Sequence, residues 1–324
     1  MRFGIIGTGE ITEKFVRNAS FNPGFEAAAI LSRSRERGEA FAARCGIPTT
    51  YTTLDEMAGD ASLDAVYVAS PNSLHMEQSV RMSEAGKHVF CEKAVASNVR
   101  ELEAMIAAAK RSGTAFLEAM RPAFNPNLPV LEAKLRELGQ PRNALLSVCK
   151  YSSRYDAFRA GDVRNAFDPS LSNGAVMDMG SYATFLLVAL FGEPKRLHAA
   201  DVKLENGFDG FGAYLAVYPG MVAEVLYSKV SRALAGSEIQ FDDASVRIGN
   251  LPGVGGIEIR YRDGRVEKLA DPDVPEYMLE TAAFLRCCED PSLAEPHHAE
   301  SLAVMRVLDE VRRQNGIAFP ADRA

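Results

Sequence analysis

The chain has 324 residues, 47% of them hydrophobic and 24% charged, which is the composition of a globular protein long enough for two domains. Its formal net charge of -7 argues against a general nucleic-acid-binding surface, because such surfaces rely on lysine and arginine to neutralise phosphates. No uninterrupted apolar run approaches the ~20 residues of a membrane helix, and no signal-peptide pattern precedes the first apolar segment, so we predict a cytoplasmic protein without membrane or nucleic-acid partners.

The first 120 residues alternate short apolar runs with helical patterns, which is typical of βαβ units and a parallel sheet. The predicted strands are residues 2–6, 25–31, 64–69, 88–91 and 115–118, with a weaker strand near Thr50. Apolar residues three and four apart predict helices over 73–85 and 98–112, and Gly86 and Gly113 stand where the C-caps of these helices belong. We therefore expect an α/β domain in residues 1–120.

The pattern changes after Met120, where three prolines fall between residues 122 and 129 and an amphipathic helix is predicted over 130–138. Strand patterns follow at 144–151, 197–204, 212–218, 221–230 and 245–248, with hairpin turns at Pro219-Gly220 and Asp263-Gly264. Helical segments over 275–288 and 297–314 are the last predicted elements. We predict a second domain, residues 121–324, of the α+β class with a mostly antiparallel sheet.

The cysteines and histidines give no metal or disulfide pattern. Five cysteines form an odd set without CxxC spacing, and we predict reduced, mostly buried thiols at Cys45, Cys91, Cys149, Cys287 and Cys288. His297 and His298 have no companion cysteine or aspartate at ligand spacing, so no metal site is predicted.

A glycine turn, Gly7-Thr8-Gly9-Glu10-Ile11-Thr12, directly follows the first predicted strand, and the spacing of Ile11, Phe15 and Ala19 predicts an amphipathic helix after it. A strand, glycine turn and helix place a pyrophosphate at the helix N-terminus, where free N–H groups and the macrodipole favour negative charge. Thr12 stands where this motif usually has its third glycine. The predicted cofactor contacts are Gly7, Thr8, Gly9, Glu10 and Ile11; an ordinary βα turn with two glycines is the alternative.

The end of the second strand distinguishes the two nicotinamide cofactors. NAD-selective sites usually have an acidic residue there, which holds the ribose 2′-hydroxyl. Here the strand is followed by Ser32, Arg33, Arg35 and Arg37, whose hydroxyl and guanidinium groups suit a 2′-phosphate. We predict NADP rather than NAD, held by Ser32, Arg33 and Arg37, with Arg35 on the solvated face of the next helix. The alternative places all three arginines on that solvated face.

Several spaced motifs then point to one family. They are Ala69-Ser70-Pro71-Asn72-Ser73-Leu74-His75, the segment 86–93 ending in Glu92-Lys93, Glu118-Ala119-Met120-Arg121, Phe167-Asp168-Pro169 and the segment 174–182. Over nearly its whole length the chain resembles the family named after glucose-fructose oxidoreductase, inositol dehydrogenase and MocA. The resemblance implies an α/β Rossmann dinucleotide-binding domain, then an α+β domain whose large open sheet forms homodimers or homotetramers, with the active site in the cleft between the domains.

Two positions depart from the family pattern. The usual Glu-Lys-Pro is Glu92-Lys93-Ala94 here, which removes the rigid backbone constraint that a proline, in its cis or trans form, imposes beside the lysine. The family's aspartate with a histidine four residues later appears as Asp178 and Tyr182. Tyrosine at this place is similar to the branch that contains glucose-fructose oxidoreductase, dihydrodiol dehydrogenase and some xylose dehydrogenases, and that branch generally uses NADP.

Oxidation of a secondary alcohol removes a proton from the hydroxyl as hydride leaves the carbon, so it needs a proton-transfer group and a cation beside the developing alkoxide. We predict that Tyr182 transfers the proton, that Lys93 promotes its ionisation and stabilises the alkoxide, and that Asp178 orients the substrate. Asp178 and Tyr182 are four apart in the helical run 175–190, which places both on one face. The alternatives are a surface lysine, a helix-capping aspartate and a tyrosine that packs in the core.

By the same resemblance, the nicotinamide side is lined by Ala69, Ser70, Pro71, Asn72, His75, Glu92 and Lys93. His75 has the alternative of a structural residue at the start of a helix, and Arg121 and Arg164 are candidate substrate contacts or interdomain ion pairs. The predicted function is an NADP-dependent oxidoreductase that transfers hydride between nicotinamide and a CH–OH carbon of a sugar, polyol or dihydrodiol. Two alternatives remain: an NADP-binding sensor or regulator without turnover, and the NAD-dependent glycosidase branch of the family.

Overall fold

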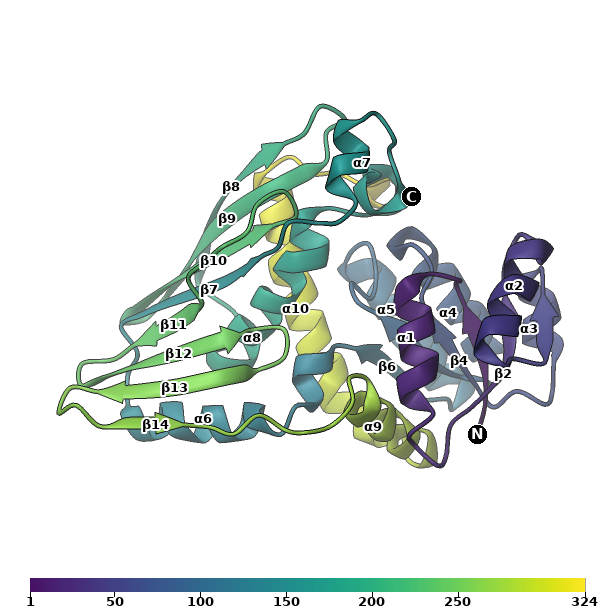
Figure 1. The fold of residues 1–324 in the computed structure, drawn as a ribbon, viewed down its shortest axis with the longest axis horizontal. Coiled ribbons are helices and arrows are strands. Elements are labelled where there is room, and N and C mark those ends of the chain that lie inside the picture. The colour runs from purple at the N-terminus through teal and green to yellow at the C-terminus, as the bar shows by residue number, and fades with distance from the viewer. Residues whose placement is uncertain (324) are drawn as a thin grey trace. The chain divides into compact units, whose positions relative to one another are not determined.

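The computed structural model describes residues 1–323 and divides the chain into two compact units (Figure 1). The first unit comprises Met1–Met120 and Val274–Ala299, and the second comprises Arg121–Asp273 and the chain from Glu300 on. The predicted second domain, residues 121–324, is therefore not continuous. Helix α9 (Met278–Glu289) belongs to the first unit because its Phe284 stacks on Phe90, with ring centroids 4.8 Å apart.

The first unit is built on a parallel six-stranded sheet in the order β3-β2-β1-β4-β5-β6. Its strands are β1 (Arg2–Ile6), β2 (Glu26–Leu31), β3 (Thr49–Tyr51), β4 (Ala65–Val68), β5 (His88–Glu92) and β6 (Phe116–Ala119). Its helices, besides α9, are α1 (Glu10–Ala19), α2 (Arg35–Cys45), α3 (Leu54–Gly59), α4 (His75–Glu84) and α5 (Val99–Ser112). The strand order reverses between β1 and β4, and ligands of such sheets bind at the carboxyl ends of the strands beside this point.

The predicted strands and helices of this unit agree with the structure to within one or two residues at most ends. The predicted helix over 73–85 begins as a 3-10 turn, Asn72–Leu74, before α4. Helix α3 has no counterpart in the prediction, although Thr53 and Glu56 form a capping box at its start, which is a signal readable in sequence.

The second unit contains an eight-stranded sheet in the order β14-β13-β12-β11-β7-β10-β9-β8. The strands are β7 (Asn143–Cys149), β8 (Arg196–Lys203), β9 (Asp209–Tyr218), β10 (Met221–Ser228), β11 (Ser237–Gln240), β12 (Ala244–Asn250), β13 (Gly255–Tyr261) and β14 (Val266–Lys268). Among the described strand pairs of this sheet, only β7 and β10 are parallel, and the other pairs are antiparallel. The predicted fold class, a Rossmann domain followed by a domain with a mostly antiparallel sheet, is therefore confirmed.

One face of this second sheet is covered and the other is open. Helix α8 (Ser181–Phe191) packs against β7 and β10, and α6 (Asn127–Leu138) lies along the same sheet (Figure 1). Residues along β10 alternate between buried and exposed, as expected when one face meets solvent. Val222 on β10 and Leu215 on β9 are 40% and 43% exposed on this open face. Strands β11, β13 and β14 were not predicted, because they are short or carry charged residues at alternate positions.

The segment Pro169–Phe191 is long and apolar enough to cross a membrane, by length and composition alone, with a mean hydropathy of 1.5 over an 18-residue window. The sequence prediction overlooked it because Asp178 interrupts the apolar run. In the structure 61% of the most apolar 18-residue window of this segment is buried, and Leu186 and Leu187 of α8 are completely inaccessible. A buried core helix of a globular protein can have the same length and composition as a membrane helix, and the burial of this segment fits a core helix.

Candidate active site

The glycine turn after β1 passes directly against the end of β4. Gly7 has a φ of 112°, and a Cβ atom there would lie 2.4 Å from the carbonyl oxygen of Ala69, so only glycine fits. Gly9 is the N-cap of α1, and a Cβ atom there would meet nothing within 4 Å. The helix N-terminus therefore opens onto free space at the strand-order switch, where its N–H groups and dipole favour an anion.

Helix α1 buries a different face from the one predicted. Thr12 is 1% exposed and, with Phe15 and Ala19, faces the core, whereas Ile11 is 48% exposed. The expectation that Ile11 shares the buried face of Phe15 and Ala19 is wrong, because positions 12, 15, 16 and 19 form the inward stripe of this helix. Ile11 instead stands exposed in the first turn of the helix, beside the proposed pyrophosphate position.

The arginines after β2 fall into two groups. Arg35 pairs with Glu39 at 3.8 Å on the exposed face of α2, which agrees with its predicted place. Arg33 and Arg37 are exposed, and neither forms an ion pair with any residue between 1 and 323. Ser34 caps α2 by accepting a hydrogen bond from the backbone N–H of Arg37 at 3.3 Å. Two uncompensated guanidinium groups thus stand at the start of this helix, as a 2′-phosphate requires.

We expect Arg33→Ala to raise the Kd of NADP by about tenfold or more, because one charge-assisted hydrogen bond to phosphate is lost, and to leave the Kd of NAD nearly unchanged. Arg35→Ala is the matched control, since its guanidinium is already paired with Glu39. Isothermal titration of each variant with both cofactors measures the effect. The assignment would be contradicted if Arg33→Ala weakened the binding of NAD and NADP equally. It would also be contradicted if Arg35→Ala weakened NADP binding as much as Arg33→Ala does.

His75 is a structural support for the segments around it. Its ring is completely buried, with Nε2 2.9 Å from the carbonyl oxygen of Ser70 and Nδ1 3.1 Å from that of Ala94. Burial is the largest influence on this imidazole and lowers its pKa, against the opposing effect of the backbone hydrogen bonds. The alternative interpretation from sequence, a structural histidine, describes it better than a cofactor contact. Ser70, Pro71 and Asn72 remain partly exposed at the end of β4.

Lys93 immediately follows β5, at the same edge of the parallel sheet, and is partly exposed. The Lys93–Ala94 peptide bond is cis. The preceding Glu92 accepts a hydrogen bond from the hydroxyl of Tyr67, a fully buried residue whose ring stacks on Phe15 with centroids 3.5 Å apart. Burial, followed by the nearby Glu92 carboxylate, raises the pKa of Tyr67, so the phenol remains a donor. Sequence reasoning missed Tyr67, although a single hydroxyl inside an apolar strand was visible.

The second unit brings together Asp178, Tyr182 and Arg121. Asp178 lies in a π-helical turn, Val176–Gly180, that leads into α8, and Tyr182 lies in the first turn of α8. The guanidinium of Arg121 stands 5.9 Å from the centre of the Tyr182 ring, within the range of a cation–π contact. The predicted single α-helix over 175–190 is thus wrong at its start, and a π-turn is a common feature of functional sites.

Two residues that sequence reasoning missed hold this turn. Lys229, which follows β10, lies 2.8 Å from Oδ2 of Asp178, and Asp209 accepts a hydrogen bond from the backbone N–H of Val176 at 2.7 Å. Gly174 is required beside Asp209, because a Cβ atom would lie 1.9 Å from its Oδ1. Arg164, in contrast, is exposed and pairs with Asp162 two residues away, so no described contact joins it to Asp178.

Asp209 is expected to make stability depend on pH. Burial raises its pKa to about 7, from an ordinary aspartate value of 3.8, so the folded state binds more protons than the unfolded state between these two pH values. This acid therefore costs no stability below about pH 4 and destabilises the fold progressively as the pH rises to about 7, by at most about 4 kcal/mol. Asp209→Asn should flatten that decline. Urea denaturation from pH 4.5 to 8 measures the free energy of unfolding of both proteins. The assignment would be contradicted if this free energy changed with pH equally in the wild type and in Asp209→Asn.

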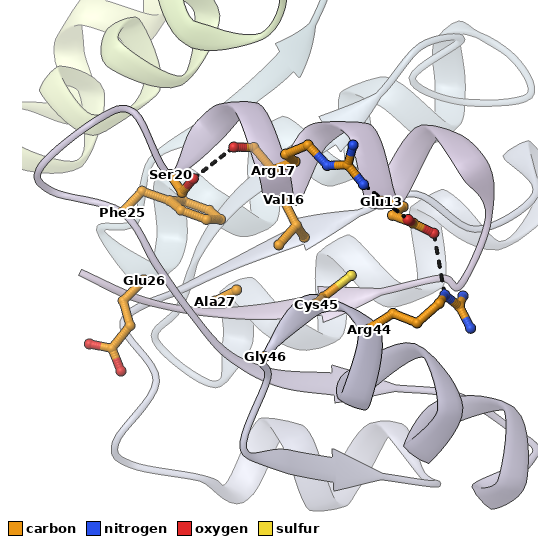
Figure 2. A pocket seen from close by; sticks show the side chains of 10 residues that line it. All are labelled: Glu13, Val16, Arg17, Ser20, Phe25, Glu26, Ala27, Arg44, Cys45 and Gly46. Carbon is orange, nitrogen blue, oxygen red and sulfur yellow. Dashed lines mark hydrogen bonds and ion pairs between the residues drawn. The ribbon is translucent and has the colours of Figure 1, made fainter.

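The cysteines are less buried than predicted. All five are free, but only Cys91 and Cys287 are buried, and Cys45, Cys149 and Cys288 are partly exposed. Cys45 lines a cavity of about 360 Å³ beside the C-terminal ends of α1 and α2. Figure 2 shows that Glu13 lies between Arg17 and Arg44 in this cavity. The Glu13 carboxylate pairs with Nη2 of Arg17 at 3.4 Å and with Nε of Arg44 at 3.5 Å. The cavity contains none of the predicted site residues.

Comparison with known proteins identifies the family. A model described as an oxidoreductase family with an NAD-binding Rossmann fold matches residues 1–119. The chain is 43% identical over 327 residues to scyllo-inositol 2-dehydrogenase (NADP(+)) of Bacillus subtilis, with 100% of both chains covered. It is 31% identical to D-xylose 1-dehydrogenase (NADP(+)) 2 of Haloferax volcanii, with 96% of both covered.

The fold is also found among solved structures. The aldose-aldose oxidoreductase from Caulobacter crescentus superposes with a TM-score of 0.82 at 23% identity, and 97% of each chain is covered. The alignment with the inositol dehydrogenase spans the whole length of this chain, both units included. The chain therefore belongs to the Gfo/Idh/MocA family of oxidoreductases, as its motifs predicted.

Proposed function

We propose that this protein is an NADP-dependent dehydrogenase that oxidises a CH–OH carbon of a polyhydroxylated ring, with scyllo-inositol as the first candidate substrate. The observation that carries the proposal is the grouping of Asp178 and Tyr182 on two consecutive helical turns, with Lys229 beside the carboxylate and Arg121 beside the phenol. These turns offer a hydrogen-bond acceptor for hydroxyl groups and a phenol for proton transfer. The 43% identity to an NADP-dependent inositol dehydrogenase supports the choice of substrate.

The residues at the end of the parallel sheet fit NADP. The open space at Gly9 and the uncompensated Arg33 and Arg37 suit the pyrophosphate and the 2′-phosphate. Ser32, Asn72 and Glu92 remain candidate contacts along the same edge. When bound, NADP supplies the acceptor for the hydride that leaves the substrate carbon.

The protein's own residues handle the proton and the substrate hydroxyls. Asp178, as a carboxylate, accepts hydrogen bonds from the hydroxyls next to the reacting carbon and orients the ring. Tyr182 takes the proton of the reacting hydroxyl, and the positive charge of Lys93 stabilises the developing alkoxide. The guanidinium of Arg121 favours the negative charge that Tyr182 acquires when it acts as the base. A polyol with several neighbouring hydroxyls fits these requirements.

We further propose a homodimer or homotetramer through the open face of the second sheet. Exposed apolar side chains on adjacent strands, Val202, Leu215 and Val222, face the same side of this sheet. Exposed apolar surface on a flat sheet face is typical of an interaction surface. Light scattering tests this, since a mass of 35.2 kDa, that of one chain, would contradict the proposal.

The function is tested by incubating the purified protein with NADP or NAD and a panel of substrates. The panel contains scyllo-inositol, other cyclic polyols, aldoses including D-xylose, and dihydrodiols. We expect NADP reduction with scyllo-inositol at a higher kcat/KM than with D-xylose, and little activity with NAD. An absence of cofactor reduction with every compound would support the sensor alternative, whereas release of an aglycone from a glycoside without net cofactor reduction would support the glycosidase alternative.

A further inference from the structure

Lys229 is a buried cation in the second unit, with its side chain only 5% exposed. Its backbone N–H donates to the carbonyl of Gly210 at 2.9 Å, and its own carbonyl accepts from the N–H of Ser152 at 2.8 Å. The ammonium group lies 5.2 Å and 5.6 Å from the ring centres of Phe167 and Phe208. A buried ammonium group is costly unless it is paired, so the partners of Nζ indicate what the residue does.

Two oxygen atoms hold the ammonium group. Nζ lies 2.8 Å from Oδ2 of Asp178, and it donates to the carbonyl oxygen of Ala166 at 2.9 Å. Ala166 belongs to the 3-10 turn Asn165–Phe167, which directly follows the candidate substrate residue Arg164. One side chain therefore joins the π-turn that carries Asp178 to the segment that carries Arg164.

A second carboxylate, Asp209, lies within electrostatic range of Lys229 but is not its partner. Burial is the largest influence on Asp209 and raises its pKa to about 7, whereas the opposing effect of Lys229 is small. An ammonium group paired directly with Asp209 would instead hold the pKa of that acid low. The charge of Lys229 is thus directed at Asp178, the partly exposed carboxylate, and not at the fully buried one.

We propose that Lys229 is a positioning residue of the active site, which fixes the direction of the Asp178 carboxylate and keeps it ionised for substrate binding. The inference rests on the proposed function, in which Asp178 orients substrate hydroxyls. An ionised carboxylate accepts hydrogen bonds through both oxygens, whereas a protonated one presents a donor and loses part of that capacity. Lys229 also tethers the turn at Ala166, so loss of its side chain would loosen two parts of the site.

The competing interpretation gives Lys229 a purely structural role. Removal of a structural lysine would destabilise the fold and leave the ionisation of Asp178 unchanged. Removal of a positioning lysine changes the pH at which Asp178 binds a proton, because the charged group beside it is lost. The ionisation of Asp178 is therefore the measurement that separates the two roles.

The experiment uses two substitutions and a matched control. Lys229→Met keeps the apolar stem and removes the charge, and Lys229→Gln also removes the charge but keeps a hydrogen-bond donor. Lys87→Met is the control, because Lys87 is 3% exposed and its ammonium group donates to the carbonyls of Asp60 and Leu63 at 2.6 and 3.2 Å. The readouts are kcat/KM against pH and ¹³C NMR titration of labelled aspartates, with the Asp178 signal assigned from Asp178→Asn.

We expect both Lys229 variants to lose about tenfold to a hundredfold in kcat/KM, because the carboxylate is no longer held in the productive direction. The acid limb of the pH profile should shift to higher pH, because Asp178 should bind its proton at a pH higher by about one unit or more. In an Asp178→Asn background, Lys229→Met should cost much less than in the wild type, since the two residues act as one unit. Lys87→Met should change none of these three results.

An unchanged Asp178 titration in Lys229→Met and Lys229→Gln would overturn the proposal, even if activity falls. The proposal would also be overturned if Lys229→Met lowered kcat/KM by the same factor in the Asp178→Asn background as in the wild type. If Lys229→Met does not fold, Lys229→Gln decides through the same titration. If the wild-type protein reduces no cofactor with any polyol, the proposed function fails, and the NMR titration still decides whether Lys229 controls Asp178.

Discussion

Lys93→Ala is expected to lower kcat by about a thousandfold, because the cation that stabilises the developing alkoxide is removed from the reacting centre. Lys93 follows β5 at the carboxyl edge of the parallel sheet, where ligands of this fold bind. The loss should fall on kcat and kcat/KM together, since the interaction is made chiefly in the transition state. Steady-state kinetics with NADP and the best polyol of the panel measures it.

The control for this variant is Lys150→Ala, which removes an exposed lysine that also directly follows a strand, β7. This variant should retain wild-type kcat. Fluorescence titration with NADPH shows whether Lys93→Ala still binds the cofactor, which distinguishes lost chemistry from lost binding. If the kcat of Lys93→Ala stayed within a few-fold of the wild-type value, Lys93 would have no role in the chemical step.

Tyr182→Phe is expected to lower kcat by about a hundredfold to ten-thousandfold, the usual contribution of a positioned proton-transfer group. Phenylalanine keeps the ring beneath the guanidinium of Arg121, so the substitution isolates the hydroxyl. KM for the polyol should change little, and the limb of the pH profile that reports ionisation of the base should disappear. Kinetics between pH 6 and pH 10 measures both effects.

Tyr218→Phe is the matched control, because Tyr218 is a tyrosine of the same unit whose hydroxyl donates to the carbonyl of Gly192 at 2.8 Å. It should leave the pH profile in place. A Tyr182→Phe protein with wild-type kcat and an unchanged profile would assign proton transfer to another group, and the role of Tyr182 would then be packing, the alternative considered from sequence.

The parallel half of the fold could be predicted from sequence because its signals are local. Strand β1 was predicted at both ends, and the other strands of this sheet were found within one or two residues. The glycine turn was equally readable, since the φ of 112° at Gly7 is a requirement of the backbone at that single position. The interpretation of Arg35 as a residue of the solvated helix face agrees with its ion pair to Glu39, although that pair was not itself predicted.

Features that depend on distant contacts could not be predicted. The pairing of Lys229 with Asp178 joins residues that are 51 positions apart, 229 minus 178, and neither belongs to a motif with the other. Helix α9 shows apolar spacing that fits either unit, and contacts with distant residues, such as those of Phe284 with Phe3 and Phe90, assign it to the first. The two carbonyls around His75 are likewise invisible in sequence, so its structural role could be named only as an alternative.

The most direct test of the central claim is to follow the hydride itself. The wild-type protein is incubated with NADP and scyllo-inositol deuterated at every ring carbon, and the reduced cofactor is analysed by mass spectrometry. We expect NADPH that carries one deuterium, together with an equal amount of the corresponding ring ketone. Tight binding of NADP without any deuterated NADPH, with this or any other polyol of the panel, would contradict it.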